Sequence, residues 1–321
     1  MFRNLCAGVL GPYRIERELG RGAMGAVLLA IDPRDGRRVA LKILSVGGAF
    51  SGEADAQARE RFLQEARTAA RLQHPAIVRV LDAGQDQGLA YIAMELASGH
   101  DLQRHAQAGQ LLPVASVLHC VARVAEALAY AHRQGVVHRD IKPANVIVEL
   151  AGARGKSGSV KVTDFGIARV ADASRTRTGV TLGTPAFMSP EQMAGRHVDG
   201  RSDLYSLGVM LFQLLSGRLP HQADTLAALM HQIANDSAPD IRTLRPDLGE
   251  TLADVVALAL QKRPELRYAD GAQLALDLQL LERRLPAPMA AKAGPESSGG
   301  VDLFSAGARI AVPRTRHNLP H

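Results

Sequence analysis

The first hundred residues or so of the chain carry short apolar runs separated by glycines and charged residues, a pattern typical of strands in a small sheet. Between the third and fourth of these runs, the apolar residues instead recur at helical spacing and predict one helix over residues 58–73. The strand-like runs are residues 13–19, 27–31, 39–42, 77–83 and 89–94.

That helix has an apolar stripe formed by Phe62, Ala66, Ala69 and Leu72, and Glu65 falls on the same stripe. A carboxylate on the buried side of a helix needs a cationic partner. The stripe therefore marks Glu65 as a residue with a role in an ion pair.

Beyond residue 97 the apolar residues recur at helical spacing over long segments, which predicts a mostly helical region. Small residues and a glycine at 95–99 break the pattern between the two regions and suggest a hinge. The predicted helices are residues 113–134, 201–216, 225–235, 248–261 and 271–284.

The ends of the chain differ from this pattern. Residues 1–11 read as an N-terminal extension, and residues 286–321, rich in Pro, Gly, Ser and Ala, are expected to form a flexible tail. One domain over residues 12–285 remains, with lobes at 12–96 and 97–285.

Candidate chemistry is concentrated in His138-Arg139-Asp140-Ile141-Lys142-Pro143-Ala144-Asn145 and in Asp164-Phe165-Gly166. Between the two segments, residues 145–148 and 160–162 read as strands joined by a Gly-rich turn, so a hairpin would bring Asp164 back beside Asn145. An amide oxygen next to a carboxylate suits a hard cation such as Mg²⁺ carrying phosphates.

A second Gly-rich segment, Gly20-Arg21-Gly22-Ala23-Met24-Gly25, lies between two predicted strands. A dinucleotide-binding loop would open a helix at its third glycine, and none is predicted here. The context instead fits a hairpin that covers phosphates.

With these motifs in this order, the chain resembles a bacterial eukaryotic-like (Hanks-type) Ser/Thr protein kinase over residues 12–285. The resemblance implies an α+β, bilobal fold: a small antiparallel-sheet N-lobe with one main helix and a larger, mostly helical C-lobe. It also implies ATP as phosphate donor, Mg²⁺ or Mn²⁺ as metal, and Ser/Thr hydroxyls of proteins as acceptors.

The resemblance assigns roles residue by residue. Asp140 would accept the proton of the substrate hydroxyl, Lys142 would offset charge on the transferred phosphate, and Lys42, paired with Glu65, would hold the α- and β-phosphates. Asn145 and Asp164 would bind the metal. The nucleotide would meet the backbone of Gly20, Gly22 and Gly25, the apolar walls Leu19, Val27, Ala40 and Ile147, the gatekeeper Met94, and the hinge residues Glu95 and Leu96.

Further positions would be structural or regulatory. Lys142 and Thr184 are typical of Ser/Thr rather than Tyr kinases, Glu191 should pair with Arg267, and Asp203 should brace the loop before Asp140. Thr176 and Thr178 match activation-loop phosphorylation sites, with Arg139 as the partner of the phosphate. Phe165, beside Asp164, belongs to this structural group.

Two alternatives stay open. A small-molecule phosphotransferase of related fold would keep the Lys, base and metal ligands, but it would lack the long segment from Asp164 to Glu191 that seats a polypeptide. A pseudokinase scaffold would normally have lost one of Lys42, Asp140 or Asp164, and all three are present.

Composition and charge narrow the partners further. The net charge of +6 is scattered and not interleaved with aromatic residues, so no nucleic-acid partner is expected. The longest apolar stretch, residues 204–215, is too short to span a bilayer, and residues 1–11 are too polar for a secretory signal. We expect a cytoplasmic protein with protein substrates, and the sequence leaves open a homodimer that autophosphorylates in trans.

Overall fold

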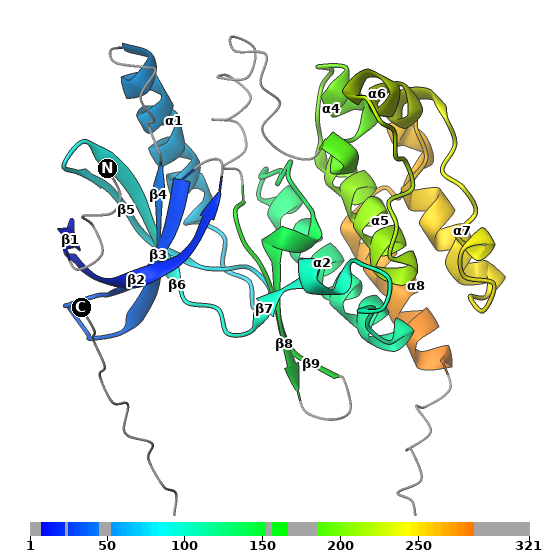
Figure 1. Ribbon diagram of the computed structural model, residues 1–321, viewed down its shortest axis with the longest axis horizontal. Helices are drawn as coiled ribbons and strands as arrows, with labels where there is room; N and C mark the ends of the chain where they lie inside the picture. Colours follow the sequence, from blue (N-terminus) through cyan, green and yellow to red (C-terminus); the bar gives the residue numbers. More distant parts are fainter. Residues whose placement is uncertain (1–7, 23–24, 45–52, 152–155, 166–184, 286–321) are drawn as a thin grey trace, which may run out of the picture. The chain divides into compact units, whose positions relative to one another are not determined.

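The computed structural model describes residues 8–22, 25–44, 53–151, 156–165 and 185–285. The chain divides into two units, Met1–Leu285 and Pro286–His321, and all of the described residues belong to the first (Figure 1). The predicted tail lies outside the described residues, as does most of the predicted extension.

The N-terminal part is an antiparallel sheet with strand order β1-β2-β3-β4-β6-β5 (Figure 1). Its strands are β1 (Val9–Leu10), β2 (Tyr13–Gly22), β3 (Gly25–Ile31), β4 (Arg38–Leu44), β5 (Val80–Asp86) and β6 (Leu89–Glu95).

Each face of this sheet has its own apolar cluster. Tyr13, Leu41 and Tyr91 belong to one cluster, whereas Phe62 of α1 (Glu53–Ala69) packs with Ile92 in the other. Side chains alternate between the faces of a strand. Lys42 lies opposite Ile92 in the β4–β6 pairing, so it projects toward the face that α1 covers.

The predicted helix over 58–73 is displaced toward the N-terminus, since α1 runs from Glu53 to Ala69. Residues 70–73 leave the helix through a tighter turn, in which the amide N–H of Leu72 donates to the carbonyl of Ala69 at 3.0 Å. This turn keeps Leu72 buried at 1% exposure. The buried Leu72 keeps the helical apolar spacing although it lies beyond the end of α1, which is why the predicted helix ended too late.

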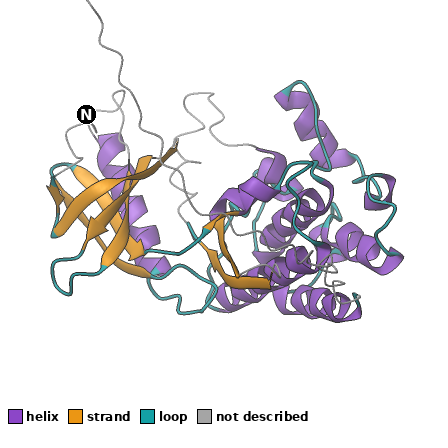
Figure 2. Ribbon diagram, turned by 60° about the horizontal axis from the view of Figure 1, so that its bottom comes forward, coloured by secondary structure: helices purple, strands orange, loops and turns teal. Residues whose placement is uncertain are grey.

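The rest of the described chain is mostly helical, as the sequence predicts (Figure 2). Its main helices are α2 (Val114–Arg133), α5 (Gly200–Ser216), α6 (Leu226–Asn235), α7 (Glu250–Ala259) and α8 (Gly271–Arg284), with the short α4 at Pro190–Met193. Helices α5 and α8 both pack on α2. At Gly271 the backbones come so close that a Cβ atom would lie 2.4 Å from the carbonyl oxygen of Ala125.

Among the described helices, α2 is long and apolar enough to cross a membrane by length and composition. Two thirds of its most apolar stretch is buried inside the protein, where residues such as Val121 and Leu128 belong to the main core. A buried core helix of a protein meets the same two criteria.

A second sheet, of strand order β7-β8-β9, carries the predicted hairpin. β8 (Val146–Ala151) pairs with β9 (Lys156–Val162), with Val146 opposite Val162, and the amide N–H of Thr163 then donates to the carbonyl of Asn145 at 3.0 Å. Asp164 consequently follows directly beside Asn145. The two-residue strand β7 (His100–Asp101), which pairs with β8, is not predicted from the sequence.

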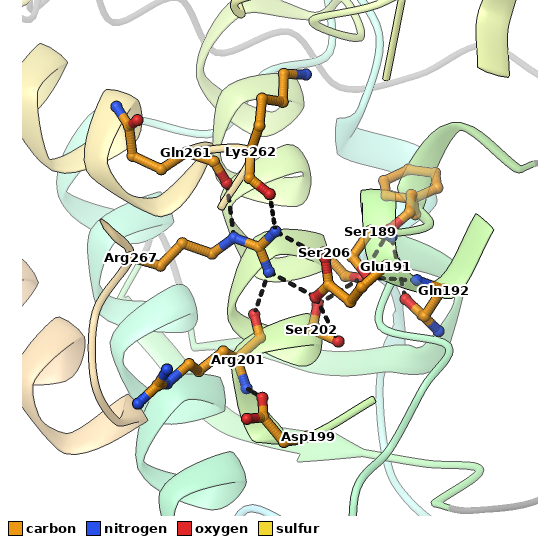
Figure 3. Close-up of polar contacts among 11 residues, drawn as sticks. Ser189, Glu191, Gln192, Asp199, Arg201, Ser202, Ser206, Gln261, Lys262 and Arg267 are labelled. Carbon is orange, nitrogen blue, oxygen red and sulfur yellow. Dashed lines mark hydrogen bonds and ion pairs between the residues drawn. The ribbon is translucent and has the colours of Figure 1, made fainter. Parts of the chain in front are cut away.

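A buried ion pair attaches α4 to the helical core (Figure 3). The Nη1 and Nη2 atoms of Arg267 donate to the two carboxylate oxygens of Glu191 at 2.7 and 2.8 Å. Both residues are only 6% exposed. The remaining N–H groups of Arg267 donate to the carbonyls of Gln261, Arg201 and Lys262. All five guanidinium N–H groups are thus satisfied, which makes the burial of this charge tolerable.

We expect Arg267→Met to lower the free energy of unfolding by about 3–5 kcal/mol, because the variant leaves the Glu191 carboxylate buried without its cation. Urea unfolding measures this loss. The matched control is Arg263→Met, whose ion pair with Glu265 is exposed on both sides (70% and 51%). Its cost should be small, because an ion pair exposed to solvent contributes little to stability. Equal losses in the two variants would contradict the role given to the buried pair.

The same pair should make stability depend on pH. Burial by itself raises the pKa of Glu191, but hydrogen bonds from Arg267 and Ser202 outweigh it and hold the pKa below its ordinary value. The folded chain then binds fewer protons at this group than the unfolded chain, whose glutamates titrate near pH ~4.3. The stabilisation is therefore present above that pH and is lost as the pH falls through the lower, native pKa.

We expect the melting temperature of the wild type to fall more steeply below about pH 5 than that of Glu191→Gln, which has no proton to gain at this position. Differential scanning fluorimetry from pH 7 downward gives both slopes. Parallel slopes would show that Glu191 keeps an ordinary pKa in the folded chain.

Candidate active site

The segment before Asp140 is held by one buried carboxylate. Asp203, in the first turn of α5, is fully buried and accepts hydrogen bonds from the backbone N–H groups of His138 (2.8 Å) and Arg139 (2.7 Å). The ring of His132, from the end of α2, lies 2.7 Å from the same carboxylate. Asp203 therefore holds this loop at two backbone positions and is itself tied to α2 through His132, in agreement with the brace expected from the family resemblance.

His138 links the loop to Asp164. Its Nε2 lies 2.9 Å from the carbonyl oxygen of Thr163, while its Nδ1 lies 3.2 Å from the amide nitrogen of Asp140. A carbonyl only accepts and an amide N–H only donates, so Nε2 carries the proton. The ring also meets Phe165 edge-on at 4.6 Å between centroids, and Phe165 is 4% exposed.

Asp140, Lys142 and Asn145 converge in the structure. Lys142 Nζ lies 2.8 and 3.0 Å from the carboxylate oxygens of Asp140, and Asn145 Nδ2 donates to Oδ2 of Asp140 at 3.0 Å and to its backbone carbonyl at 2.7 Å. The short helix Pro143–Asn145 brings the amide back to the carboxylate. Because the amide nitrogen is engaged with Asp140, the amide oxygen is the atom of Asn145 that can bind a cation.

Asp164 is held in the left-handed backbone region, with φ of +67°, and its Oδ1 lies 2.8 Å from Lys42 Nζ. Burial alone raises the pKa of Asp164, but the charge and hydrogen bond of Lys42, helped by His138 and Lys142, lower it below its ordinary value. The carboxylate is therefore ionised at neutral pH and can bind a metal ion.

Lys42 thus has a partner other than the one expected from the sequence. Lys42 is 7% exposed and forms its ion pair with Asp164, whereas Glu65 lies half-buried on α1. The pairing of Lys42 with Glu65 stays a prediction.

The residues expected around the nucleotide lie on neighbouring strands. Gly20 pairs with Val27 and Gly22 with Gly25 across β2 and β3, and Ala40 pairs with Met94 across β4 and β6. Leu19 and Leu96 are each 39% exposed, whereas Met94 is buried. Ile147 comes from β8, in the second sheet.

A small pocket lies between α1, the strands β5 and β6, and Phe165. Of the residues expected around adenine, only Met94 lines it, so this pocket is separate from the predicted apolar walls. Its lining residues are Ala66, Ala69, Ile77, Val78, Val80, Ile92, Met94, Asp164 and Phe165.

Some sequence-based assignments cannot be placed. Thr176, Thr178 and Thr184 lie outside the described residues. Arg139 is described: its backbone has φ of +68°, and its carbonyl accepts a hydrogen bond from Gln192 Nε2 of α4 at 2.9 Å.

One link between the hinge and the strand that leads to Asp164 is not predicted from the sequence. Lys161 Nζ of β9 lies 2.5 Å from Oε1 of Glu95, and the same oxygen accepts the amide N–H of Arg79 at 3.1 Å. The sequence assigns a role only to the backbone of Glu95. Lys161 and Glu95 are 66 residues apart, and no local spacing pattern could have paired them.

Comparisons with known proteins agree with this geometry. The model of the protein kinase domain matches residues 13–278. A probable serine/threonine-protein kinase of Streptomyces coelicolor is 37% identical over 301 residues, covering 92% of this chain and 43% of its own. The serine/threonine-protein kinase PknJ of Mycobacterium tuberculosis is 41% identical over 283 residues, covering 86% of this chain and 46% of its own.

Among solved structures, the crystal structure of Rad53 1–466 in complex with AMP-PNP matches with a TM-score of 0.67 and 26% identity, over 82% of this chain and 64% of that one. The chain spans less than half the length of the two bacterial relatives. The expected fold, an antiparallel-sheet lobe followed by a helical lobe, is confirmed. The chain belongs to the protein kinase family, with the eukaryotic-like Ser/Thr kinases of bacteria as its relatives.

Proposed function

We propose that the chain transfers the γ-phosphate of ATP to Ser and Thr hydroxyls of proteins. The observation that carries this proposal is the convergence of Asp140, Lys142 and Asn145 within hydrogen-bonding distance, next to the Lys42–Asp164 pair. ATP as the nucleotide is supported by the family and by the similarity to Rad53, whose structure contains AMP-PNP.

In the proposed reaction Asp140 accepts the proton of the incoming hydroxyl as its oxygen bonds to the γ-phosphorus and the bond to the β–γ bridging oxygen breaks, releasing ADP. Asn145 and Lys142 hold the Asp140 carboxylate in place. Lys142 also offers positive charge to the phosphoryl group as negative charge spreads over its oxygens.

The chain also supplies the groups that would hold the nucleotide. Lys42, steadied by Glu65, would bind the α- and β-phosphates, and the backbone of Gly20, Gly22 and Gly25 would approach them closely. The adenine would lie between the apolar walls Leu19, Val27, Ala40 and Ile147, with its edge on the backbone of Glu95 and Leu96 next to Met94.

The donor set fits a magnesium ion. The amide oxygen of Asn145 and the carboxylate of Asp164 are hard oxygen ligands, and the described residues contain no cluster of three or more His, Cys, Asp or Glu side chains that would form a closed cage. Mg²⁺, and similarly Mn²⁺, is usually bound by one or two such groups together with waters and phosphates. When bound, the ion would neutralise charge on the phosphates.

We also propose the substrates, the location and the bounds of the domain. Protein substrates follow from the family, and we infer a cytoplasmic location, where ATP is available. The domain is proposed to cover residues 12–285.

We expect Asp140→Asn to lower kcat for phosphate transfer to a generic basic protein by about 10²–10⁴-fold, because it removes the proton acceptor. Nucleotide affinity, measured by calorimetry, should change little, since Asp140 does not hold the nucleotide. The matched control is Asp254→Asn on an exposed position of α7, which should leave both quantities unchanged.

The result also separates the alternatives. A scaffold would show no transfer in the wild type and no difference in the variant. A small-molecule phosphotransferase would consume ATP with small hydroxyl compounds and leave proteins unlabelled.

We further propose that the chain phosphorylates itself on Thr176 and Thr178, giving Arg139 a doubly charged partner next to Asp140. Mass spectrometry after incubation with ATP should find both threonines modified, and Thr176→Ala/Thr178→Ala should reduce activity on other proteins. The control Ser174→Ala/Thr181→Ala changes the same segment at neighbouring hydroxyls.

Full activity with both threonines unmodified would rule this out. If autophosphorylation occurs in trans between two copies, its initial rate per molecule should rise with protein concentration. A rate independent of concentration would indicate a reaction within one molecule.

A further inference from the structure

Two histidine rings face each other just after the hinge. His100 lies in β7, and His105 ends the short 3₁₀ helix Leu102–His105 that follows it. Their Nε2 atoms are 3.0 Å apart, the ring centroids are 5.2 Å apart, and the ring planes are inclined by 53°. Both rings are half-buried, and neither takes part in the proposed phosphate transfer.

The protonation of His105 follows from its other nitrogen. Nδ1 lies 2.9 Å from the carbonyl oxygen of Gln110, and a carbonyl oxygen can only accept, so Nδ1 carries a proton. In the neutral ring Nε2 then has a lone pair, which faces His100. An imidazole that donates from one nitrogen to a backbone carbonyl and presents the other is the arrangement found in protein ligands of transition metals.

The spacing of the two Nε2 atoms is close to that of a chelating pair. Two imidazole nitrogens at 2.0–2.1 Å from one tetrahedral ion are about 3.3 Å apart. The observed 3.0 Å needs to open by only about 0.3 Å, which small rotations of the two rings about their side-chain bonds supply. His100 would shift its proton from Nε2 to Nδ1, which is the other neutral tautomer.

The backbone fixes both rings in place. His100 pairs with Val148 of β8, and Gly99 before it has φ of +103°, with a Cβ atom at that position lying 2.0 Å from the carbonyl oxygen of Val148. Asp101 caps the 3₁₀ helix by accepting the amide N–H of Gln103, and Leu102 is fully buried. The two ligands are therefore preorganised.

We propose that His100 and His105 form a binding site for a borderline transition-metal ion of the Zn²⁺ class, Ni²⁺ and Cu²⁺ included. Imidazole nitrogen suits these ions, whereas Mg²⁺ and Ca²⁺ prefer oxygen. Within the described part of the chain no cluster of three or more His, Cys, Asp or Glu side chains is present, so His100 and His105 are the two protein ligands there and water can fill further coordination positions. The ion would cross-link β7 to the 3₁₀ helix. Strand β7 pairs with β8, the strand that contains Ile147.

The test is isothermal titration of the full chain, first stripped with a chelator, with ZnCl₂ and with NiCl₂. The wild type should take up one ion that His105→Ala and His100→Ala each lose, with affinity lowered at least about tenfold. The controls His119→Ala and His231→Ala remove histidines from helices α2 and α6 and should leave this binding step intact. Titration with MgCl₂ should not displace the Zn²⁺.

A spectroscopic readout keeps the test decisive if a variant folds poorly. Electron paramagnetic resonance of the folded wild type with one equivalent of Cu²⁺ should report two imidazole nitrogens, and the milder variants His100→Gln and His105→Gln should report one. Equal Zn²⁺ affinity in wild type and His105→Ala, or absence of uptake by the wild type, would overturn the proposal.

Discussion

The hydrogen bonds to Asp203 are the constraint on which the active-site geometry depends. A fully buried carboxylate is costly unless donors surround it, and this one receives the backbone N–H groups of His138 and Arg139 together with the ring of His132. These bonds also hold Arg139 in the left-handed backbone region, which costs a residue with a side chain about 1–2 kcal/mol. The direction in which Asp140 leaves the loop is therefore set from α5.

The opposite side of the loop is held by a second buried network. The carbonyl of Arg139 accepts a hydrogen bond from Gln192, and the neighbouring Glu191 is bound by Arg267 through two hydrogen bonds. Arg267 comes from the segment between α7 and α8 and donates to carbonyls there. Arg267 is thereby linked, through Glu191 and the adjacent Gln192, to the backbone of the residue before Asp140, although it lies far from it in the sequence.

How far the sequence could predict this site depends on the range of each contact. The hairpin that brings Asp164 beside Asn145, the Glu191–Arg267 pair and the brace at Asp203 were all predicted, because motif spacing or the family resemblance marks these residues. Lys161–Glu95 and His100–His105 were not, since neither pair belongs to a motif and β7 is too short to have a hydrophobic period. The Lys42–Asp164 contact shows a further limit: the helical spacing marked Glu65 as an acid for this lysine, and no spacing pattern indicated that the Asp164 carboxylate lies 2.8 Å from it.

Three contacts fix Asp164 to the N-terminal sheet. Lys42 pairs with its carboxylate, Lys161 joins β9 to Glu95 at the end of β6, and the backbone of Val162 bonds with that of Ala76 and Val78 on the approach to β5. A relative movement of sheet and catalytic loop at β9 would break all of these contacts together. The β2–β3 hairpin, which is proposed to cover the phosphates, has a register shift between Glu18 and Gly20 and contains glycines without side chains. In the proposed reaction this hairpin would adapt to the nucleotide, while Asp164, the proposed metal ligand, would stay in place.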